Sequence, residues 1–346
     1  MILKVQIRTT RLLKIFPSID TVMKEKKNNT KAINDERREN RSHSQQFEVD
    51  QKAHEEQKED WDLVASGWEK WGKDLEDQGA RQVSERLIEL ARIECGQKVL
   101  DLACGYGEPA VTAALKIHPS GSVLGIDISA GLLSIAKRRA TACGLTNIKF
   151  KQENIEKIEL PKSYFDSALC RWGLLFSQDI ESTMKKVYDC LVSGGRFAVA
   201  VWGPPEKVPV LSIPFQATTR VMRSTEVNNE GDTCSLLSHC DGASPFRLSN
   251  KQSLRRVFQS AGFKEVRVES VPLIIKSNSA KEFAEKTLEL SAPLNQMLMK
   301  INSDVERVRT RSKVTHAIAE AAASYAGNSS NIVLKNEVLL AVGLKS

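Results

Sequence analysis

The sequence predicts an α/β protein built on a doubly wound, mainly parallel sheet of seven strands. Three observations support this class: segments of strand and helix character alternate from residue 97 onward, a turn with two glycines follows the first strand, and one more apolar strand ends the chain. Alternating strands and helices are typical of parallel sheets with right-handed crossover connections. The hydrophobic content of 41% is sufficient for a large globular core.

Residues 1–55 precede this alternation and are predicted to form a disordered, basic tail. They include a long polar run without periodicity, so they can bury little apolar surface to offset the entropy of ordering. The tail holds twelve Lys and Arg against eight Asp and Glu, and the remainder of the chain is nearly neutral. This distribution does not favour a nucleic-acid partner. Translation starts at Met1 and at Met23 are both compatible with the pattern.

A helical segment begins at about Trp61. Trp61, Trp68 and Trp71 are spaced by seven and three residues, which places their rings on one face of a helix. This face either packs against the core or covers a bound ligand, and the sequence leaves both alternatives open.

The alternation is clearest in residues 97–202, inside a domain predicted to span residues 56–346. Short apolar runs bounded by turn residues favour strands that are buried on both faces. The expected strands lie at residues 97–104, 121–129, 148–154, 163–172 and 196–203, and the expected helices at 108–118, 130–144 and 180–192. Residues 97–202 are therefore the predicted cofactor-binding core.

The alternation stops after Trp202. We expect an irregular insertion at residues 203–249, a helix and a strand within 250–277, helical stretches within 279–326, and a last, antiparallel strand at 336–344. The insertion and residues 279–326 are expected to form a helical lid with substrate-binding elements over the strand ends. Their apolar residues either line a pocket or pack on the sheet.

The turn after the first strand carries the functional signal. Gly105 and Gly107 permit backbone conformations that other residues avoid, and the helix that follows offers free N–H groups. Ligands of doubly wound sheets bind at this edge, beside the first strand. Asp127 ends the second strand, where a carboxylate accepts hydrogen bonds from both hydroxyls of a ribose. The pattern predicts a ligand that contains a ribose.

These segments resemble a known family. The runs VLDLACGYG, VLGIDIS, FKQENIEKIELP, YFDSALCRWGLLF and LVSGGRFAVAVW are similar, in order and spacing, to the motifs of class I S-adenosylmethionine-dependent methyltransferases, above all the ubiquinone and menaquinone biosynthesis branch. The resemblance covers about residues 61–346. It implies a Rossmann-like fold, S-adenosylmethionine as cofactor, and methyl transfer to a small hydrophobic or aromatic acceptor by in-line displacement.

The resemblance also implies roles for individual residues. Asp101 would hold the amino group of the cofactor's methionine part, Asp127 the ribose, and Asn154 the adenine amino group. The other cofactor-binding residues that it implies are Ala103, Cys104, Gly105, Gly107, Ile128, Ile155 and Cys170. Ala103 stands where the family motif has its first glycine, and Asn154 where the family often has aspartate.

On the acceptor side, the fourth strand ends at the site, so Arg171 and Trp172 are expected to border the substrate together with Trp68. No side chain stands out as a general base. His239 in the insertion is retained as a candidate catalytic residue.

An NAD-dependent oxidoreductase is the main alternative, because Gly105, Gly107 and Ala110 also fit the G-x-G-x-x-G/A pattern of dinucleotide-binding turns. Asp101 argues against it, since its carboxylate would face the diphosphate of NAD. Two further alternatives remain: a protein that binds S-adenosylmethionine without turnover, and a nucleic-acid methyltransferase that uses the basic tail as a tether.

The seven cysteines form an odd set without CxxC or Cys/His ligand spacing. This argues against a disulfide framework and a zinc site, so we expect no metal and a cytoplasmic location. No apolar run approaches the roughly 20 residues that a transmembrane helix needs, so none is predicted.

Deletion of residues 1–55 is expected to leave the unfolding temperature nearly unchanged, because a segment without apolar periodicity adds little buried surface. Thermal unfolding of the full chain and the deletion variant, followed by circular dichroism, measures this. A longer deletion through residue 75, which also removes the three tryptophans, should damage the fold. A large drop in unfolding temperature for the shorter deletion would contradict the prediction.

Overall fold

The computed structural model describes residues 51–224, 244–326 and 330–346. The chain divides into two units, Met1–Glu56 and Gln57–Ser346, and all the elements named below lie in the second.

The predicted disordered tail lies outside the described residues except for its last five residues. Residues 51–63 are helical, so the prediction is wrong for residues 51–55. This segment is rich in Gln, Lys, Glu and Ala, which all favour helix.

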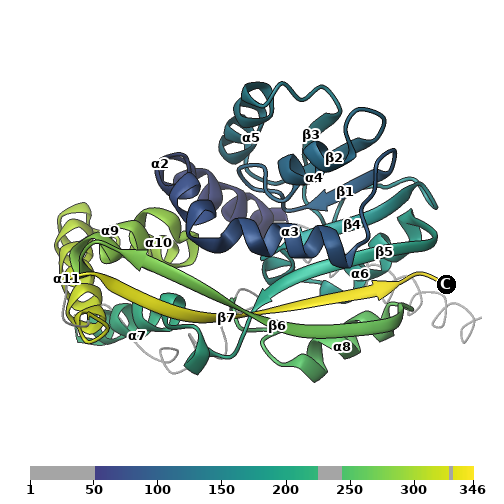
Figure 1. The fold of residues 1–346 in the computed structure, drawn as a ribbon. Helices are drawn as coiled ribbons and strands as arrows, with labels where there is room; N and C mark the ends of the chain where they lie inside the picture. Colours follow the sequence, from purple (N-terminus) through teal and green to yellow (C-terminus); the bar gives the residue numbers. More distant parts are fainter. Residues whose placement is uncertain (1–50, 225–243, 327–329) are drawn as a thin grey trace, which may run out of the picture. The chain divides into compact units, whose positions relative to one another are not determined.

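One sheet of seven strands organises the larger unit, in the order β3-β2-β1-β4-β5-β7-β6 (Figure 1). The strands are β1 (Lys98–Leu102), β2 (Ser122–Asp127), β3 (Ile148–Gln152), β4 (Phe165–Arg171), β5 (Leu191–Trp202), β6 (Lys264–Ser277) and β7 (Ile332–Leu344). Strands β1 to β5 pair in parallel, and β7 is antiparallel to both β5 and β6. The predicted doubly wound, mainly parallel class is confirmed.

Helices cover both faces of this sheet. They are α2 (Ala65–Leu75), α3 (Arg81–Leu90), α4 (Ala110–Ile117), α5 (Ala130–Ala142), α6 (Ile180–Cys190), α7 (Pro209–Ser224), α8 (Lys251–Ser260), α9 (Ala280–Leu290), α10 (Ala292–Met299) and α11 (Asp304–Ala323). Apolar residues of α3, α4 and α5 pack on one face, and those of α6 and α8 pack on the other. The strand order reverses beside β1, which is where doubly wound sheets bind ligands.

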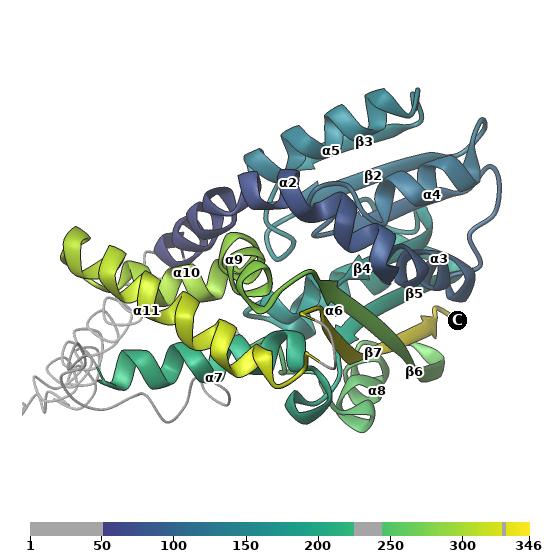
Figure 2. The ribbon, with the colours of Figure 1, turned by 60° about the vertical axis from the view of Figure 1, so that its left-hand side comes forward.

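A third core lies beyond the sheet, where α7, α9, α10 and α11 gather (Figures 1 and 2). Residues 203–249 were expected to be irregular, and this is wrong for Pro209–Ser224, which form α7. Pro214 lies inside this helix, and proline argues against a helix when only the sequence is considered. Burial of Ile213 and Phe215 in the third core stabilises the helix. Residues 225–243 of the insertion lie outside the described residues.

The tryptophan-bearing segment is broken in the middle. One turn of π-helix, η1 (Glu76–Ala80), joins α2 to α3, with Gly79 at a φ of 138°. Such turns interrupt α-helices at functional sites more often than elsewhere. Here the turn carries Glu76, which is buried.

Candidate functional site

The first cavity lies at the carboxyl ends of β1, β2 and β4. It holds about 830 Å³ between its atoms, part of which is open to solvent. Residues of the turn 103–108, the ends of β2 and β4, and the N-terminal segment form its walls: Gln57, Trp61, Trp68, Ala103, Cys104, Gly105, Tyr106, Glu108, Asp127, Ile128, Leu132, Asn154, Ile155, Glu156, Arg171, Trp172, Gly173, Phe176 and Ser177.

The structure brings most of the predicted site residues together around this first cavity. Those that line the cavity are Trp68, Ala103, Cys104, Gly105, Asp127, Ile128, Asn154, Ile155, Arg171 and Trp172. Asp101, Gly107 and Cys170 are buried and do not line it. His239 lies outside the described residues.

The turn holds a conformation that leaves its backbone open to a ligand. Gly105 has a φ of 53°, and a Cβ added there would meet no atom within 4 Å. Ala103 has the same left-handed φ of 53°, which is uncommon for a residue with a side chain. Across from it, a Cβ on Gly173 would lie 2.2 Å from the Cβ of Ala103. A small residue is therefore required at the end of β4.

Asp127 is buried at the end of β2 and is fixed by backbone donors. Its Oδ2 accepts a hydrogen bond from the Gly105 N–H at 2.8 Å, and its Oδ1 accepts one from the Ser129 N–H at 2.9 Å. Each oxygen keeps a further lone pair for a ligand. Burial raises the pKa of Asp127 to about 6, although the backbone hydrogen bonds oppose this shift.

Asp101 is the second buried carboxyl group of the site. It is fully buried on β1, and among the described residues neither of its oxygens accepts a hydrogen bond of normal geometry, although the backbone N–H of Ala110 lies near enough to lower its pKa. Burial raises its pKa well above the usual range, while the charge of Arg171 acts in the opposite direction. A buried acceptor without a donor is costly, so it marks a place where a cationic or donor group is expected to bind.

Asp62 links the segment before α2 to the residues that follow β2. Its Oδ1 accepts hydrogen bonds from the Ser129 hydroxyl at 2.6 Å and from the Gly131 N–H at 2.9 Å. Ser129 in turn caps α5 through its bond with the Leu132 N–H. These bonds tie the segment before α2 to the end of β2, next to Asp127.

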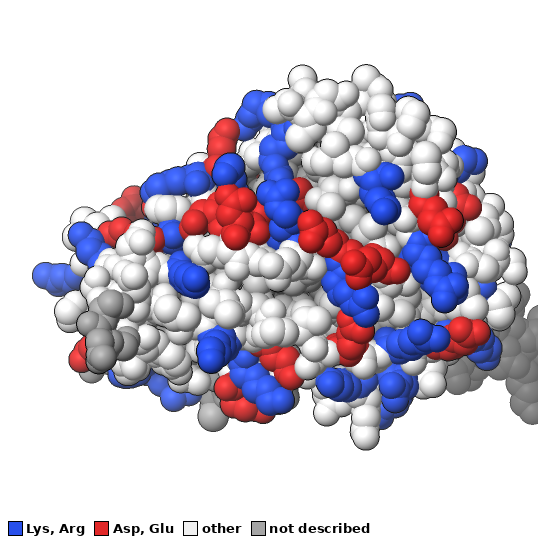
Figure 3. All heavy atoms as spheres, in the orientation of Figure 1, with Lys and Arg blue, Asp and Glu red and all other residues white. Residues whose placement is uncertain are grey.

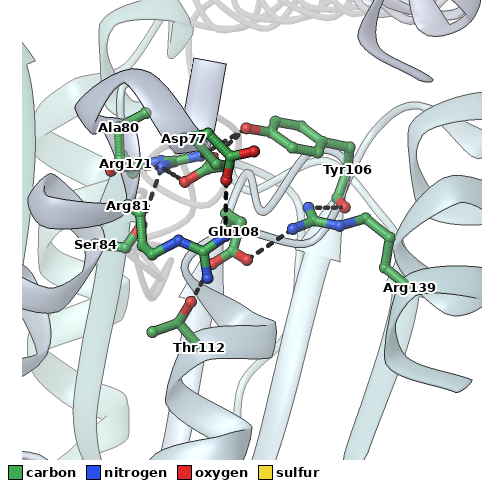
Figure 4. Close-up of polar contacts among 10 residues, drawn as sticks. Asp77, Ala80, Arg81, Ser84, Tyr106, Glu108, Thr112, Arg139 and Arg171 are labelled. Atoms are coloured by element: carbon green, nitrogen blue, oxygen red, sulfur yellow. Dashed lines mark hydrogen bonds and ion pairs between the residues drawn. The ribbon is translucent and has the colours of Figure 1, made fainter. Parts of the chain in front are cut away.

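A buried ion pair joins η1 to the end of β4. The two Nη groups of Arg171 donate to the two Glu76 oxygens at 2.7 Å and 3.1 Å. Nη1 also donates to the Ala80 carbonyl and the Ser84 hydroxyl (Figure 4). Both side chains are 2% exposed. The Tyr106 hydroxyl donates to Glu76 as well. Burial raises the pKa of Glu76, but the charge and hydrogen bonds of Arg171 outweigh it and keep that pKa below its usual value.

The same turn is held from α5. Arg139 donates to the Tyr106 carbonyl at 2.9 Å and to Glu108 at 2.8 Å, and Thr112 donates to the other Glu108 oxygen at 2.6 Å (Figure 4). The turn 103–108 is thus fixed by charged groups from two sides.

A second, larger cavity adjoins the first. It holds about 1080 Å³ between its atoms, again partly open, and its walls come from α2, α7 and α9 and from the ends of β4, β5 and β6. All five tryptophans of the chain line it: Trp61, Trp68, Trp71, Trp172 and Trp202. The remaining lining is largely apolar and includes Leu75, Val210, Leu211, Phe215, Ile275, Phe283 and Leu290.

The two cavities share four aromatic residues. Trp61, Trp68, Trp172 and Phe176 line both. Trp172 stacks on Trp202 with ring centroids 4.8 Å apart. The indole nitrogens of Trp68 and Trp172 are buried and, among the described residues, have no hydrogen-bond partner. A ligand in the second cavity would therefore meet flat aromatic walls next to the first.

Two charged residues, Asp74 and Lys286, also line the second cavity. Lys286 of α9 forms ion pairs with Asp74 at 2.7 Å and with Glu282 at 2.6 Å, and its ammonium lies 4.5 Å from the Trp71 ring centroid. Trp71 donates its indole N–H to Glu289 at 2.6 Å. These contacts hold α2 against α9.

Sequence reasoning missed Glu76, Tyr106 and Asp62. Each makes its contact with a residue at least 30 positions away along the chain. Periodicity reports only local structure, so these pairings left no local signal in the sequence.

Within the described ranges, no group of three or more His, Cys, Asp or Glu side chains is arranged to hold a metal ion. No helix of the same residues is long and apolar enough to cross a membrane. Five cysteines are described, and all are free thiols: Cys95, Cys104, Cys143, Cys170 and Cys190.

Comparison with known proteins matches residues 78–277 to the model of the ubiE/COQ5 methyltransferase family. A demethylmenaquinone methyltransferase of Symbiobacterium thermophilum is 30% identical over 136 residues, 39% of this chain and 49% of that protein. An aklanonic acid methyltransferase of Streptomyces is 33% identical over 116 residues, 34% of this chain and 53% of that protein. The chain thus spans about half the length of these relatives.

Among solved structures, the YcgJ protein of Bacillus subtilis is similar, with 19% identity, coverage of 77% of this chain and 98% of that one, and a TM-score of 0.47.

Replacing Arg171 by Met is expected to lower the free energy of unfolding by about 3–5 kcal/mol, because it leaves the Glu76 carboxylate buried without its counter-charge. Denaturant unfolding measures this change. The matched control is Lys185→Met, which breaks the exposed Lys185–Asp189 pair and should change stability by less than about 1 kcal/mol. Equal small effects from both variants would show that the buried pair does not hold η1 on β4.

Proposed function

Because the chain belongs to the ubiE/COQ5 methyltransferase family, we propose that it transfers a methyl group from S-adenosylmethionine to a small, planar and largely apolar acceptor. The observation that carries this proposal is the shared wall between the first cavity and a second one that every tryptophan of the chain lines. Family membership also sets aside the alternative of an NAD-dependent oxidoreductase.

The residues present fit the cofactor. Asp127 offers free lone pairs to the two ribose hydroxyls, and Asn154 and Ile155 line the cavity on the same side. Asp101 is a buried carboxyl group that accepts no hydrogen bond of normal geometry among the described residues, and the cofactor's ammonium supplies a donor. Since Asp101 does not line the cavity, we infer that it acts on the ammonium through the turn or through a water molecule.

The second cavity suits the acceptor. Flat aromatic rings favour stacking with a planar molecule, and the apolar lining excludes water. Demethylmenaquinone and aklanonic acid, after which two relatives are named, are the first acceptors to assay.

When bound, S-adenosylmethionine supplies an electrophilic methyl group. The protein's own part is then to align the acceptor and keep water out, since an in-line displacement gains most of its rate from positioning. Trp172 and Trp68 orient the acceptor at the border of the two cavities, and the Glu76–Arg171 pair holds the end of β4 on which Trp172 sits. The free thiols fit a cytoplasmic location, which is part of the same proposal.

Incubation with methyl-labelled S-adenosylmethionine and these acceptors tests the proposal. We expect labelled acceptor and an equal amount of S-adenosylhomocysteine. Leu211 lines only the second cavity, so Leu211→Trp should raise the acceptor KM roughly tenfold or more and leave cofactor affinity unchanged. Cofactor binding without any product, with these acceptors and with extracted metabolites, would favour a non-catalytic binding protein.

Cofactor affinity is expected to rise with pH through about 6. The pKa of Asp127 lies above its usual value in the folded protein. Ionisation of this group therefore lowers the free energy of unfolding as the pH rises from about 4 to 6. Ribose hydroxyls donate to the ionised form and therefore bind better above pH 6.

Asp127→Asn should flatten this profile and, at pH 7.5, weaken binding by about 10-fold to 150-fold. Calorimetric titration at several pH values measures both effects. A mutant that unfolds early but binds normally would show that Asp127 only stabilises its own turn.

A further inference from the structure

A third pocket lies at the other end of the sheet and is rich in arginine. It is lined by Arg86, Glu89, Leu90, Arg92, Arg196, Glu265, Arg267, Val342, Gly343 and Leu344, which come from α3, β5, β6 and β7 and their ends. Arg196 and Trp202 stand six residues apart on β5, a distance of about 20 Å at 3.3 Å per residue. The pocket is thus well separated from the cavity that holds Trp202.

Strand register explains why the arginines converge. Arg196 of β5 lies opposite Leu344 of β7, and Arg267 of β6 lies opposite Val342. Leu344 and Val342 are two residues apart on β7, so their neighbours Arg196 and Arg267 share one face of the sheet. Val342 belongs to the core that α3 covers. Both guanidinium groups therefore extend toward the C-terminal end of α3, where Arg92 follows.

The charges in this pocket are unbalanced. Arg86 is neutralised by Glu269 at 2.7 Å and by Glu89 at 2.7 Å. Among the described residues, Arg92, Arg196 and Arg267 form no ion pair, and the only hydrogen bond of the Arg196 side chain is a long one of 3.4 Å to the Gly194 carbonyl. Glu265 is the one carboxylate of the lining that Arg86 does not engage. Three guanidinium groups thus face one acid.

The positive charges of the three arginines act on one another, as the pKa of Arg196 indicates. Partial burial and the positive charges of Arg92 and Arg267 lower the pKa of Arg196, and Glu265 offsets this only in part. Like charges held together by strand pairing cost free energy unless an anion enters between them. Figure 3 shows Lys and Arg side chains, with Asp and Glu among them, at the lower right, over the region where Figure 1 places α8 and β6.

We propose that Arg92, Arg196 and Arg267 form a binding site for a phosphoryl group. Guanidinium groups bind oxyanions through pairs of parallel hydrogen bonds, and three of them supply more donors than the two oxygens of a carboxylate can accept. A phosphoryl group offers three or more oxygens and up to two negative charges. Its source is either a free phosphorylated metabolite or a phospholipid headgroup, and the site does not depend on the proposed methyl transfer.

Calorimetric titration of the full chain with inorganic pyrophosphate, at constant ionic strength, tests the site. We expect binding that the double variant Arg196→Gln/Arg267→Gln weakens by at least about tenfold, because each guanidinium contributes charge-assisted hydrogen bonds. The matched control is Arg256→Gln on α8, an exposed arginine outside the pocket, which should bind pyrophosphate as the unaltered protein does.

A second measurement is independent of any ligand. At low salt and without phosphate, Arg267→Gln should raise the unfolding temperature, since it relieves repulsion, and pyrophosphate should then stabilise it less than it stabilises the unaltered protein. Arg256→Gln should do neither. This readout also shows that the variants fold.

Sedimentation with vesicles of phosphatidylcholine, with and without phosphatidylglycerol, separates the two sources. Binding to the anionic vesicles that pyrophosphate reverses assigns the site to a headgroup, and pyrophosphate binding alone assigns it to a free metabolite. The proposal is overturned if neither probe binds at millimolar concentration, or if Arg256→Gln weakens binding as much as the double variant does.

Discussion

The buried ion pair between Glu76 and Arg171 is the constraint on which the site depends. It connects the π-helical turn between α2 and α3 to the end of β4, and Tyr106 of the turn 103–108 bonds to the same pair. Such a pair adds little stability over an apolar contact, but neither partner tolerates the loss of the other. The pair therefore connects the end of β4, the turn 103–108 and η1.

The position of α2 explains how one wall serves two cavities. Because η1 is held on β4, Trp68 of α2 lies over the turn 103–108 and stacks on Tyr106 with ring centroids 5.1 Å apart. Trp71, on the same helix, donates a hydrogen bond to Glu289 of α9. Residues of α7, α9 and α10 then complete the second cavity. These helices share a core with α11 on the same side of the molecule (Figure 2). Trp61, Trp68, Trp172 and Phe176 line both cavities, so in the proposed reaction these rings border both the methyl donor and the acceptor.

Much of this was predictable from the sequence. The alternation of strands and helices, the antiparallel last strand and the three tryptophans on one face are local patterns, and local patterns report secondary structure well. The turn at Gly105 and the acid at Asp127 follow from the sheet class. The roles of Glu76 and Arg196 were not predictable, because each depends on strand register or on packing between distant segments. The helix around Pro214 was missed because proline predicts the end of a helix, and the sequence does not show that packing compensates for the hydrogen bond that proline removes.

A crystal structure with S-adenosylhomocysteine bound tests the central claim most directly, because the claim is that the donor's sulfur faces the tryptophan-lined cavity. The account predicts that the ribose lies on Asp127, the ammonium lies nearest to Asp101, and the sulfur lies at the border that Trp68 and Trp172 share. A nucleoside bound in the second cavity, or a sulfur turned away from these two rings, would contradict it.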